Sequence, residues 1–298
     1  MPPAIRRFTR FAGLDWSGQA VARPAGIALA ACATGTTAPV LHRPPGGWSR
    51  PAILDWLVAE AEAGSDLLIG IDFSPALPFA DRGAYFPHWP DSPADAPALW
   101  ALVDRLCADE PHLSASTLTA HAAIGRHYRH SIRRETLRGD LFEGSVGRLR
   151  LVERRCRDLK LGNAVSGFNL IGAAQVGKSS LTGMRLLHRL RGRVPVWPFD
   201  PVPPRGPLIV EIYTTVAARA AGLTGSRTKI RDAGTLDTAL AALGSAPHVP
   251  LSQYDDHATD ALLAAAWLRH AAEDPSLWTP PALDSALAGT EGWTFGIP

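Results

Sequence analysis

The sequence has few of the features that mark membrane or secreted proteins. No apolar run approaches the ~20 residues of a membrane-spanning helix, and the longest, 27–33 and 261–268, suit core segments. The basic start of the chain meets Asp15 before any apolar stretch typical of a secretory signal. There are only three cysteines, widely spaced and without a C-x-x-C pair, which disfavours a disulfide framework or a zinc site. These absences predict a cytoplasmic protein with no membrane partner.

The composition is that of a globular protein, but its charge is unevenly distributed. The chain has 298 residues, 46% of them hydrophobic and 19% charged, with a net charge of +2. Residues 122–193 hold 16 Lys and Arg against 5 Asp and Glu, a net of +11, so the rest of the chain has a net of −9. A basic segment in an acidic chain predicts a polyanion partner and a separate carboxylate-rich site. A solvated, Arg-rich helical surface is the alternative.

Hydrophobic patterning predicts an α/β fold in a single domain, 1–298. The expected strands are 8–15, 26–33, 39–42, 66–73 and 208–213. The expected helices are one that begins after Ser49, then 98–108, 179–190, 236–243 and 256–272. This order is that of the ribonuclease H-like (RNase H-like) fold, a mixed five-stranded sheet of order 3-2-1-4-5 flanked by helices. Residues 80–206 would form a large helical, Arg-rich insertion between strands 4 and 5, and 273–298 a C-terminal tail.

Carboxylates occupy positions on these apolar strands where charge is costly to bury. Asp15 and Asp72 each end a strand, Glu211 lies within one, and Asp260 lies near the start of the last long helix. A sheet that brings them together needs a cation, and Mg²⁺ or Mn²⁺ is the natural choice for oxygen ligands. Two such ions about 4 Å apart can cleave a phosphodiester bond. The alternative for each aspartate alone is a turn residue at a strand end.

The last long helix offers further candidate ligands. Asp256 and His257 precede Asp260 by four and three residues, which places all three side chains on one helix face.

Several motifs in order resemble the bacterial domain-of-unknown-function family 429, predicted nucleases of the RNase H-like superfamily nearest to its RuvC-type branch. The matching segments are F-A-G-L-D-W-S-G (11–18), I-G-I-D-F-S-P-A-L-P (69–78), G-A-A-Q-V-G-K-S-S-L-T-G-M (172–184), V-W-P-F-D (196–200), L-I-V-E-I-Y (208–213) and D-D-H-A-T-D-A-L (255–262). The resemblance implies that Asp15, Asp72, Glu211 and Asp260 are the catalytic, metal-binding acids. It also implies a second ligand from the last helix, His257, with Asp256 as the alternative.

The segment Gly172–Ser179 also fits the phosphate-binding pattern G-x-x-x-x-G-K-[ST], between an apolar run and a helix. It suggests a P-loop NTPase or nucleotide kinase as an alternative function. Too few strands follow it for a P-loop sheet, and Gly183 weakens the required helix. In the nuclease interpretation, Lys178 holds a phosphate of the nucleic-acid backbone instead.

Arginines at helical spacing predict that the insertion contacts DNA or RNA. The residues expected to bind nucleic acid are Arg126, Arg129, Arg133, Arg134, Lys178, Ser179 and Lys229. Arg148 and Arg150 continue the same basic stretch. The sequence therefore predicts a metal-dependent nuclease with a two-metal-ion mechanism. A non-catalytic nucleic-acid-binding module is a further alternative.

Overall fold

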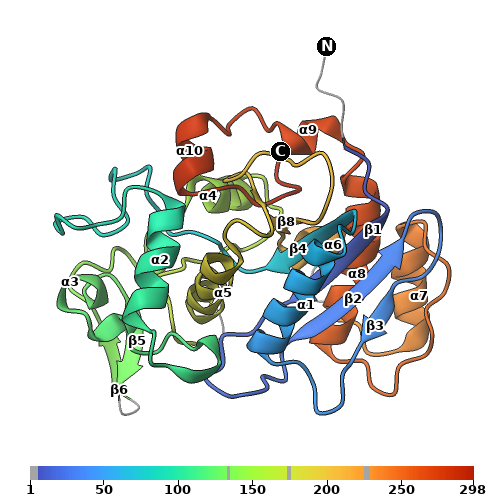
Figure 1. Ribbon diagram of the computed structural model, residues 1–298, viewed down its shortest axis with the longest axis horizontal. Helices are drawn as coiled ribbons and strands as arrows, with labels where there is room; N and C mark the ends of the chain where they lie inside the picture. The colour runs from blue at the N-terminus through green and yellow to red at the C-terminus, as the bar shows by residue number, and fades with distance from the viewer. Residues whose placement is uncertain (1–5, 133–134, 173–175, 225–228) are drawn as a thin grey trace.

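The computed structural model describes residues 6–132, 135–172, 176–224 and 229–298. Its main sheet is mixed and has six strands in the order β3-β2-β1-β4-β8-β7 (Figure 1). The strands are β1 (Arg10–Asp15), β2 (Ala28–Ala33), β3 (Val40–His42), β4 (Leu67–Asp72), β7 (Val196–Trp197) and β8 (Leu208–Glu211). β2 is antiparallel to β1 and β3, whereas β1, β4, β8 and β7 pair in parallel. The α/β class is confirmed.

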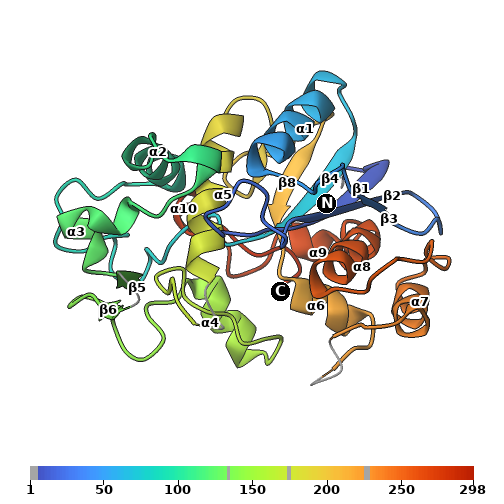
Figure 2. The same cartoon turned by 90° about the horizontal axis from the view of Figure 1, so that it is seen from below.

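Helices cover both faces of this sheet. They are α1 (Arg50–Glu62), α2 (Ala96–Leu106), η1 (Pro111–Leu113), η2 (Leu118–Ala120), α3 (Ala122–Gly125), α4 (Leu151–Asp158), α5 (Val176–Leu190), α6 (Thr214–Ala220), α7 (Ala233–Ala242), α8 (Asp256–Ala271), α9 (Pro275–Trp278) and α10 (Ser285–Thr290). In Figure 2, α1 lies on one side of the sheet and α6, α7 and α8 lie on the other. Within the described ranges, no helix has both the length and the apolar content to cross a membrane.

Alternating side chains of the strands build the two halves of the core. In β4, Leu67, Ile69 and Ile71 pack with α1, α2 and α5, whereas Leu68 packs with α6, α7 and α8. The start of α1 follows the expected pattern, because the Ser49 side chain accepts a hydrogen bond from the Ala52 amide. A strand buried on both faces reads as a continuous apolar run, which is why its position could be predicted.

The sheet has one strand more than expected. β7 consists of two residues and joins the sheet beside β8. Pro195 precedes it and Pro198 follows it, so no run long enough to show a strand period is present in the sequence. The prediction of five strands is therefore wrong by this short edge strand.

The prediction of a helix through the first arginines of the insertion is also wrong. Two short strands, β5 (Arg129–Ile132) and β6 (Glu135–Arg138), pair there in antiparallel and form a hairpin. Tyr128 and His130 are buried while Ser131 is exposed, so burial alternates with the period of a strand. The spacing of charged residues does not show which side chains are buried. Here the spacing of the arginines matched a helix although the segment forms a strand. The insertion also contains the helices α2, α4 and α5.

The segment 273–298 differs from the expected tail. It contains α9 and α10, and the side chains of Trp293, Phe295 and Ile297 are buried. The Phe295 amide donates to the Glu211 carbonyl, and Thr294 forms a parallel bridge with Glu211. The alternation of large apolar residues at 293, 295 and 297 is a strand-like pattern that its prolines obscure.

Candidate functional site

Two aspartates meet at one edge of the sheet because their strands are parallel neighbours. Asp15 ends β1 and Asp72 ends β4, and the register of the two strands pairs them directly. The preceding residues, 11–14 and 67–71, are buried, so apolar packing fixes both strands up to the carboxylates. The sheet thus holds two carboxylates side by side at the point where each strand leaves the core.

A third carboxylate comes from α8, which packs directly on β1. A Cβ atom on Gly13 would lie 2.4 Å from the Ala261 carbonyl oxygen and 2.7 Å from the Ala264 Cβ. The absence of a side chain at Gly13 therefore sets how closely helix and strand approach. Asp260, next to Ala261, lies close enough to Asp15 for the charge of Asp15 to raise the pKa of Asp260.

We expect Gly13→Ala to destabilise the fold by about 1–3 kcal/mol, because the added methyl group overlaps backbone atoms of α8 that cannot move independently. Gly289→Ala is the matched control, since a Cβ there meets no atom within 4 Å and Gly289 lies in a helix. Urea unfolding measures both. Equal stability of the two variants would contradict direct packing of α8 on β1.

Burial and mutual repulsion dominate the electrostatics of the three aspartates. Burial raises the pKa of Asp72 well above its usual value, and the charges of Asp15, Asp260 and Glu211 raise it further. Burial, together with the charges of Asp15 and Asp256, raises the pKa of Asp260 to about 7. The Asp72 carboxylate accepts a 3.0 Å hydrogen bond from the Thr214 hydroxyl. No hydrogen bond or ion pair from a described residue reaches the Asp260 carboxylate, although the more distant charges of His257 and Arg231 partly oppose the rise in its pKa.

His257 is the neighbour that moderates the cluster. Its Nδ1 lies 2.5 Å from Oδ2 of Asp15, and this contact raises the pKa of His257. Burial raises the pKa of Asp15, although the His257 hydrogen bond opposes the rise. The structure thus brings His257 to the acids, in agreement with its place three residues before Asp260.

Asp256, the alternative ligand, is held in another ion-pair group. Its carboxylate lies 2.5 Å from Arg231 and 3.3 Å from Lys229, and these two cations lower its pKa. Lys229, expected to bind nucleic acid, is therefore paired with a carboxylate, although its side chain remains 68% exposed. Their shared helix face could not show which of Asp256 and His257 joins the acids. That depends on their neighbours, which come from other segments: Lys229 and Arg231 for Asp256, and Asp15 for His257.

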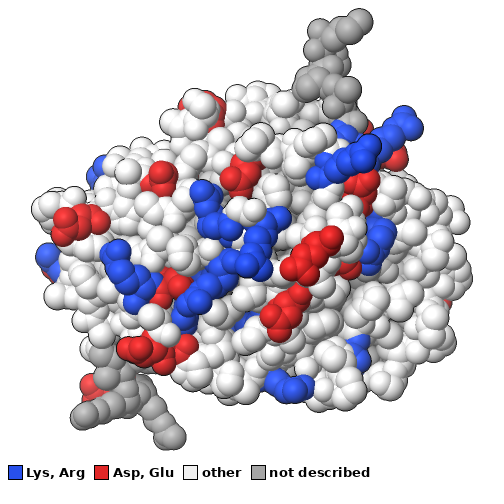
Figure 3. Space-filling model, in the orientation of Figure 1, with Lys and Arg blue, Asp and Glu red and all other residues white. Residues whose placement is uncertain are grey.

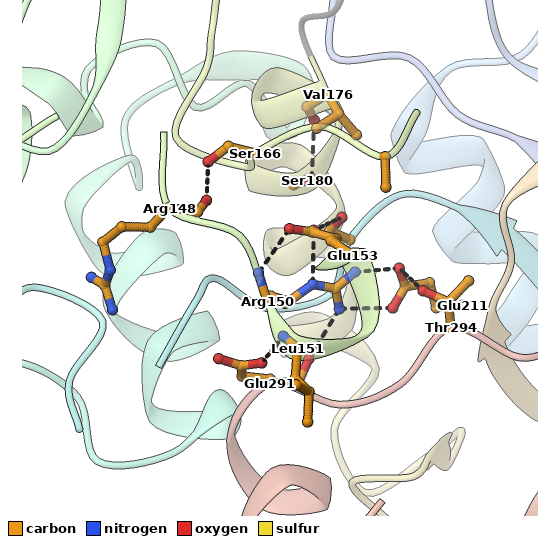
Figure 4. A network of polar contacts seen from close by, with 12 residues as sticks. Arg148, Arg150, Leu151, Glu153, Ser166, Val176, Ser180, Glu211, Glu291 and Thr294 are labelled. Atoms are coloured by element: carbon orange, nitrogen blue, oxygen red, sulfur yellow. Dashed lines mark hydrogen bonds and ion pairs between the residues drawn. The ribbon is translucent and has the colours of Figure 1, made fainter. Parts of the chain in front are cut away.

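Glu211 lines the same edge but is neutralised by a buried arginine (Figure 4). The Arg150 guanidinium donates to both carboxylate oxygens of Glu211, at 2.8 and 2.5 Å, and Thr294 donates a third hydrogen bond. Arg150 also donates from Nε to Glu153, 2.9 Å away, and from Nη1 to the Glu291 carbonyl. Burial alone would lower the pKa of Arg150, but the charges of Glu211 and Glu153 raise it. Glu211 thus has its counter-charge inside the protein, unlike Asp72 and Asp260.

A cavity of about 290 Å³ lies in front of these groups. Asp15, Asp72 and Glu211 line it from the strands, Ser179 lines it from α5, and Tyr213 lines it beyond β8. Part of its surface is apolar, where side chains such as that of Phe73 form the wall. Its volume approaches the lower end of the range for small-molecule sites. A small substrate group can therefore enter and reach Asp15 and Asp72.

The donor chemistry of the aspartates fits a hard divalent cation, but their present orientations do not form a finished coordination shell. Among the described residues, no group of three or more His, Cys, Asp or Glu side chains is placed to hold a metal ion. Asp15 is turned to His257 and Asp72 to Thr214, as expected for carboxylates that repel one another and accept from the nearest donors. Half-buried carboxylates that repel one another favour Mg²⁺ or Mn²⁺ over softer metals. Binding requires that these side chains rotate toward one point.

The basic stretch of the insertion is partly buried and largely paired. Arg148 donates to Asp81 and to three backbone carbonyls, and Arg150 is held by Glu211 and Glu153, so neither of these arginines is available to phosphate. Arg126 is exposed and pairs with Asp140. Arg129 lies on β5, whereas Arg133 and Arg134 fall outside the described residues. On the face seen in Figure 3, Lys and Arg form a band with Asp and Glu beside it, so this face has mixed charge.

The sequence reasoning missed Arg150 and Glu153 as parts of the site. Their local signal is a capping box at the start of α4, in which the Arg150 amide donates to Glu153. That signal predicts a helix start and not a link to β8. Comparison with protein-family models, with curated proteins and with solved structures finds no match for this chain. The resemblance to family 429 therefore stays a prediction.

Proposed function

We propose that this protein is a divalent-metal-dependent nuclease with an RNase H-like fold. The observation that carries the proposal is the meeting of Asp15 and Asp72 at one sheet edge with Asp260 of α8 close to them, all three half-buried and without a cationic side chain bound to Asp72 or Asp260 among the described residues. The sheet order β3-β2-β1-β4-β8 agrees with the order expected for that fold, with β7 added at the edge. Carboxylates at this edge, beside a cavity, are suited to phosphodiester hydrolysis.

Asp15, Asp72 and Asp260 would hold the metal, and His257 would orient Asp15. Bound Mg²⁺ or Mn²⁺ supplies activation of a water molecule and neutralisation of charge on the phosphodiester. Glu211 lines the cavity while Arg150 fixes its position, so its contribution is to shape the site and to add negative potential near Asp72. The lining from Phe73 and Ile212 excludes water from one side of the reacting group.

The P-loop alternative lacks support from the segment before α5. Among the described residues, the apolar run 168–171 is not a strand of the main sheet, and it forms only an isolated bridge between Asn169 and Arg129. A P-loop lies between a central strand and a helix. Residues 173–175 of the motif fall outside the described residues. A non-catalytic nucleic-acid-binding module is distinguished from the nuclease by cleavage.

The test of the function is cleavage of single-stranded and duplex DNA and RNA with Mg²⁺, with Mn²⁺ and with a chelator. We expect cleavage of at least one substrate with metal and none with chelator. Asp15→Asn protein, purified in parallel, should be inactive, which separates cleavage by this protein from that by a contaminating nuclease. Asp55→Asn, at an exposed position of α1, is the matched control and should be active. Equal cleavage by wild type and Asp15→Asn would refute the proposal.

Metal binding can be measured without nucleic acid. We expect Mn²⁺ to raise the melting temperature of the wild type, since a ligand at 100 times its Kd stabilises the folded state by about 2.7 kcal/mol. Asp260→Asn should lose most of this rise because it removes a charged ligand. Asp256→Asn, on the same helix, should retain it, because Arg231 and Lys229 hold that carboxylate. The opposite result would assign the ligand to Asp256.

A further inference from the structure

A second cavity, of about 230 Å³, lies on the other side of the first turns of α5. It is smaller than most small-molecule sites, which begin at about 300 Å³, and suits a single small group. Polar side chains line much of it, among them those of Ser116, Thr119, His130, Ser131 and Lys178. No carboxylate stands among its described lining residues. An ammonium, an imidazole and several hydroxyls form a set of hydrogen-bond donors suited to an anion.

His130 adds a second donor to the cavity. The residue is 9% exposed, it lines the cavity, and it makes no hydrogen bond or ion pair with any residue of the described ranges. Its ring nitrogens are not among the fully buried polar atoms, so they are open to a small group that enters the cavity. The backbone of His130 pairs with Leu137 in the hairpin, so the fold holds this residue at the cavity.

The walls of the cavity are held by a buried cation. Arg50 is fully buried and donates to the carbonyls of Ser17 and Gln19, at 2.9 and 3.0 Å, and to the Ser114 hydroxyl, at 3.3 Å. It thereby joins the loop after β1 to the segment before Ala115. No ion pair with a described carboxylate neutralises Arg50. Burial and the charge of Arg185 lower its pKa to about 10, so it stays positive at neutral pH and favours an anion nearby.

The second cavity adjoins the aspartate site through α5. Lys178 lines the second cavity, and the next residue, Ser179, lines the first. Trp16, which directly follows Asp15, donates a 3.0 Å hydrogen bond to the Thr182 hydroxyl at the second cavity. A Cβ on Gly18 would lie 2.2 Å from the Lys178 carbonyl carbon, so the loop after β1 rests directly on the helix. One loop and one helical turn separate the two cavities.

We propose that the second cavity binds a phosphate of a nucleic-acid strand while a neighbouring phosphodiester lies at the aspartates. This inference rests on the proposed function. Lys178 contributes the mobile charge, Ser116, Ser131 and His130 donate hydrogen bonds, and Arg50 supplies positive potential from behind the wall. Phosphate contacts of this kind fix the position of a strand without reading its sequence. The second cavity thus sets which phosphodiester reaches the first.

Binding is tested in a chelator, so that cleavage plays no part. Inorganic phosphate and a single-stranded oligonucleotide are titrated into the full chain, and phosphate is used to displace the bound oligonucleotide. We expect Lys178→Ala and His130→Gln each to weaken phosphate binding about tenfold. Lys178→Ala should also lower the salt dependence of oligonucleotide binding by about one unit of slope. Arg105→Ala removes a charge from an exposed position of α2 and should change neither.

The outcomes separate this inference from the nuclease proposal. Absence of phosphate binding, or binding unaffected by either variant, refutes the cavity assignment even when cleavage depends on Asp15. Phosphate that binds but does not compete with the oligonucleotide also refutes it, because the site then serves a free phosphorylated molecule. Tight Mg²⁺-dependent binding of ATP, lost in Lys178→Ala, overturns it in favour of the P-loop alternative. If phosphate competes with the oligonucleotide but the protein cleaves no substrate, the cavity assignment is supported and the nuclease proposal is refuted.

Discussion

Asp72→Asn should abolish metal-dependent cleavage while the protein stays folded. The change is nearly isosteric, and the amide oxygen of the new side chain can still accept from the Thr214 hydroxyl, which now lies 3.0 Å from the Asp72 carboxylate. It removes one of the three proposed metal ligands from the centre of the cluster, since Asp72 pairs with Asp15 in the sheet and the charge of Asp260 raises its pKa. We expect a loss of about 10³-fold or more in rate, the scale of losing a principal electrostatic contribution to catalysis.

The same variant should raise the stability of the metal-free protein. Burial and neighbouring charges raise the pKa of Asp72 in the folded state, so ionising it costs free energy on folding. That cost is absent below the unfolded pKa and grows as pH rises toward and through the folded pKa. The stability gain of Asp72→Asn should therefore be larger at pH 8 than at pH 4. Thermal melts at both pH values, paired with the cleavage assay, measure the two effects.

Asp55→Asn serves again as the control, since Asp55 is exposed and far from the strand ends in sequence. It should change neither cleavage nor the pH dependence of stability. Full cleavage by Asp72→Asn would remove Asp72 from the ligand set. A melting temperature of Asp72→Asn below that of the wild type at pH 8 would contradict the repulsion among the aspartates.

The sequence predicts the placement of Asp15 and Asp72 because the relevant signals are local. Each ends an apolar run that is buried over its whole length, and parallel neighbours bring their carboxyl ends to one edge. Helix α8 is similarly marked by Asp255, whose side chain caps the Ala258 amide. Strand ends, caps and continuous apolar runs depend on residues within a few positions, so they are readable without a structure.

The remaining features depend on partners far away in the chain. Arg150 lies in a stretch with many arginines, and only its pairing with Glu211, 61 residues later, shows that it is buried. The C-terminal segment looks like a tail by its prolines, yet Glu291 accepts hydrogen bonds from the amides of Phe79, Ala80 and Leu151. No local period encodes such contacts. The burial of a charged side chain is therefore the part that sequence reasoning could not supply.

Arg150→Met should cause the largest loss of stability among single changes at this site. Arg150 is 1% exposed and lies between the carboxylates of Glu211 and Glu153, which are also buried. Removing one partner of a buried ion pair costs about 3–5 kcal/mol, because the carboxylates remain without compensating charge. The methionine side chain fills much of the same volume, so the loss reports the missing charge more than a cavity.

Urea unfolding of a double-mutant cycle isolates this cause. Glu211→Gln added to Arg150→Met should restore part of the lost stability, since one uncompensated carboxylate is then neutral. Arg154→Met, on the same helix and only half-buried, is the matched control and should cost less than about 1 kcal/mol. Equal losses in Arg150→Met and Arg154→Met would mean that the pair is not buried as described. If the double variant is as unstable as Arg150→Met, the cost of that change lies in packing and not in an uncompensated charge on Glu211.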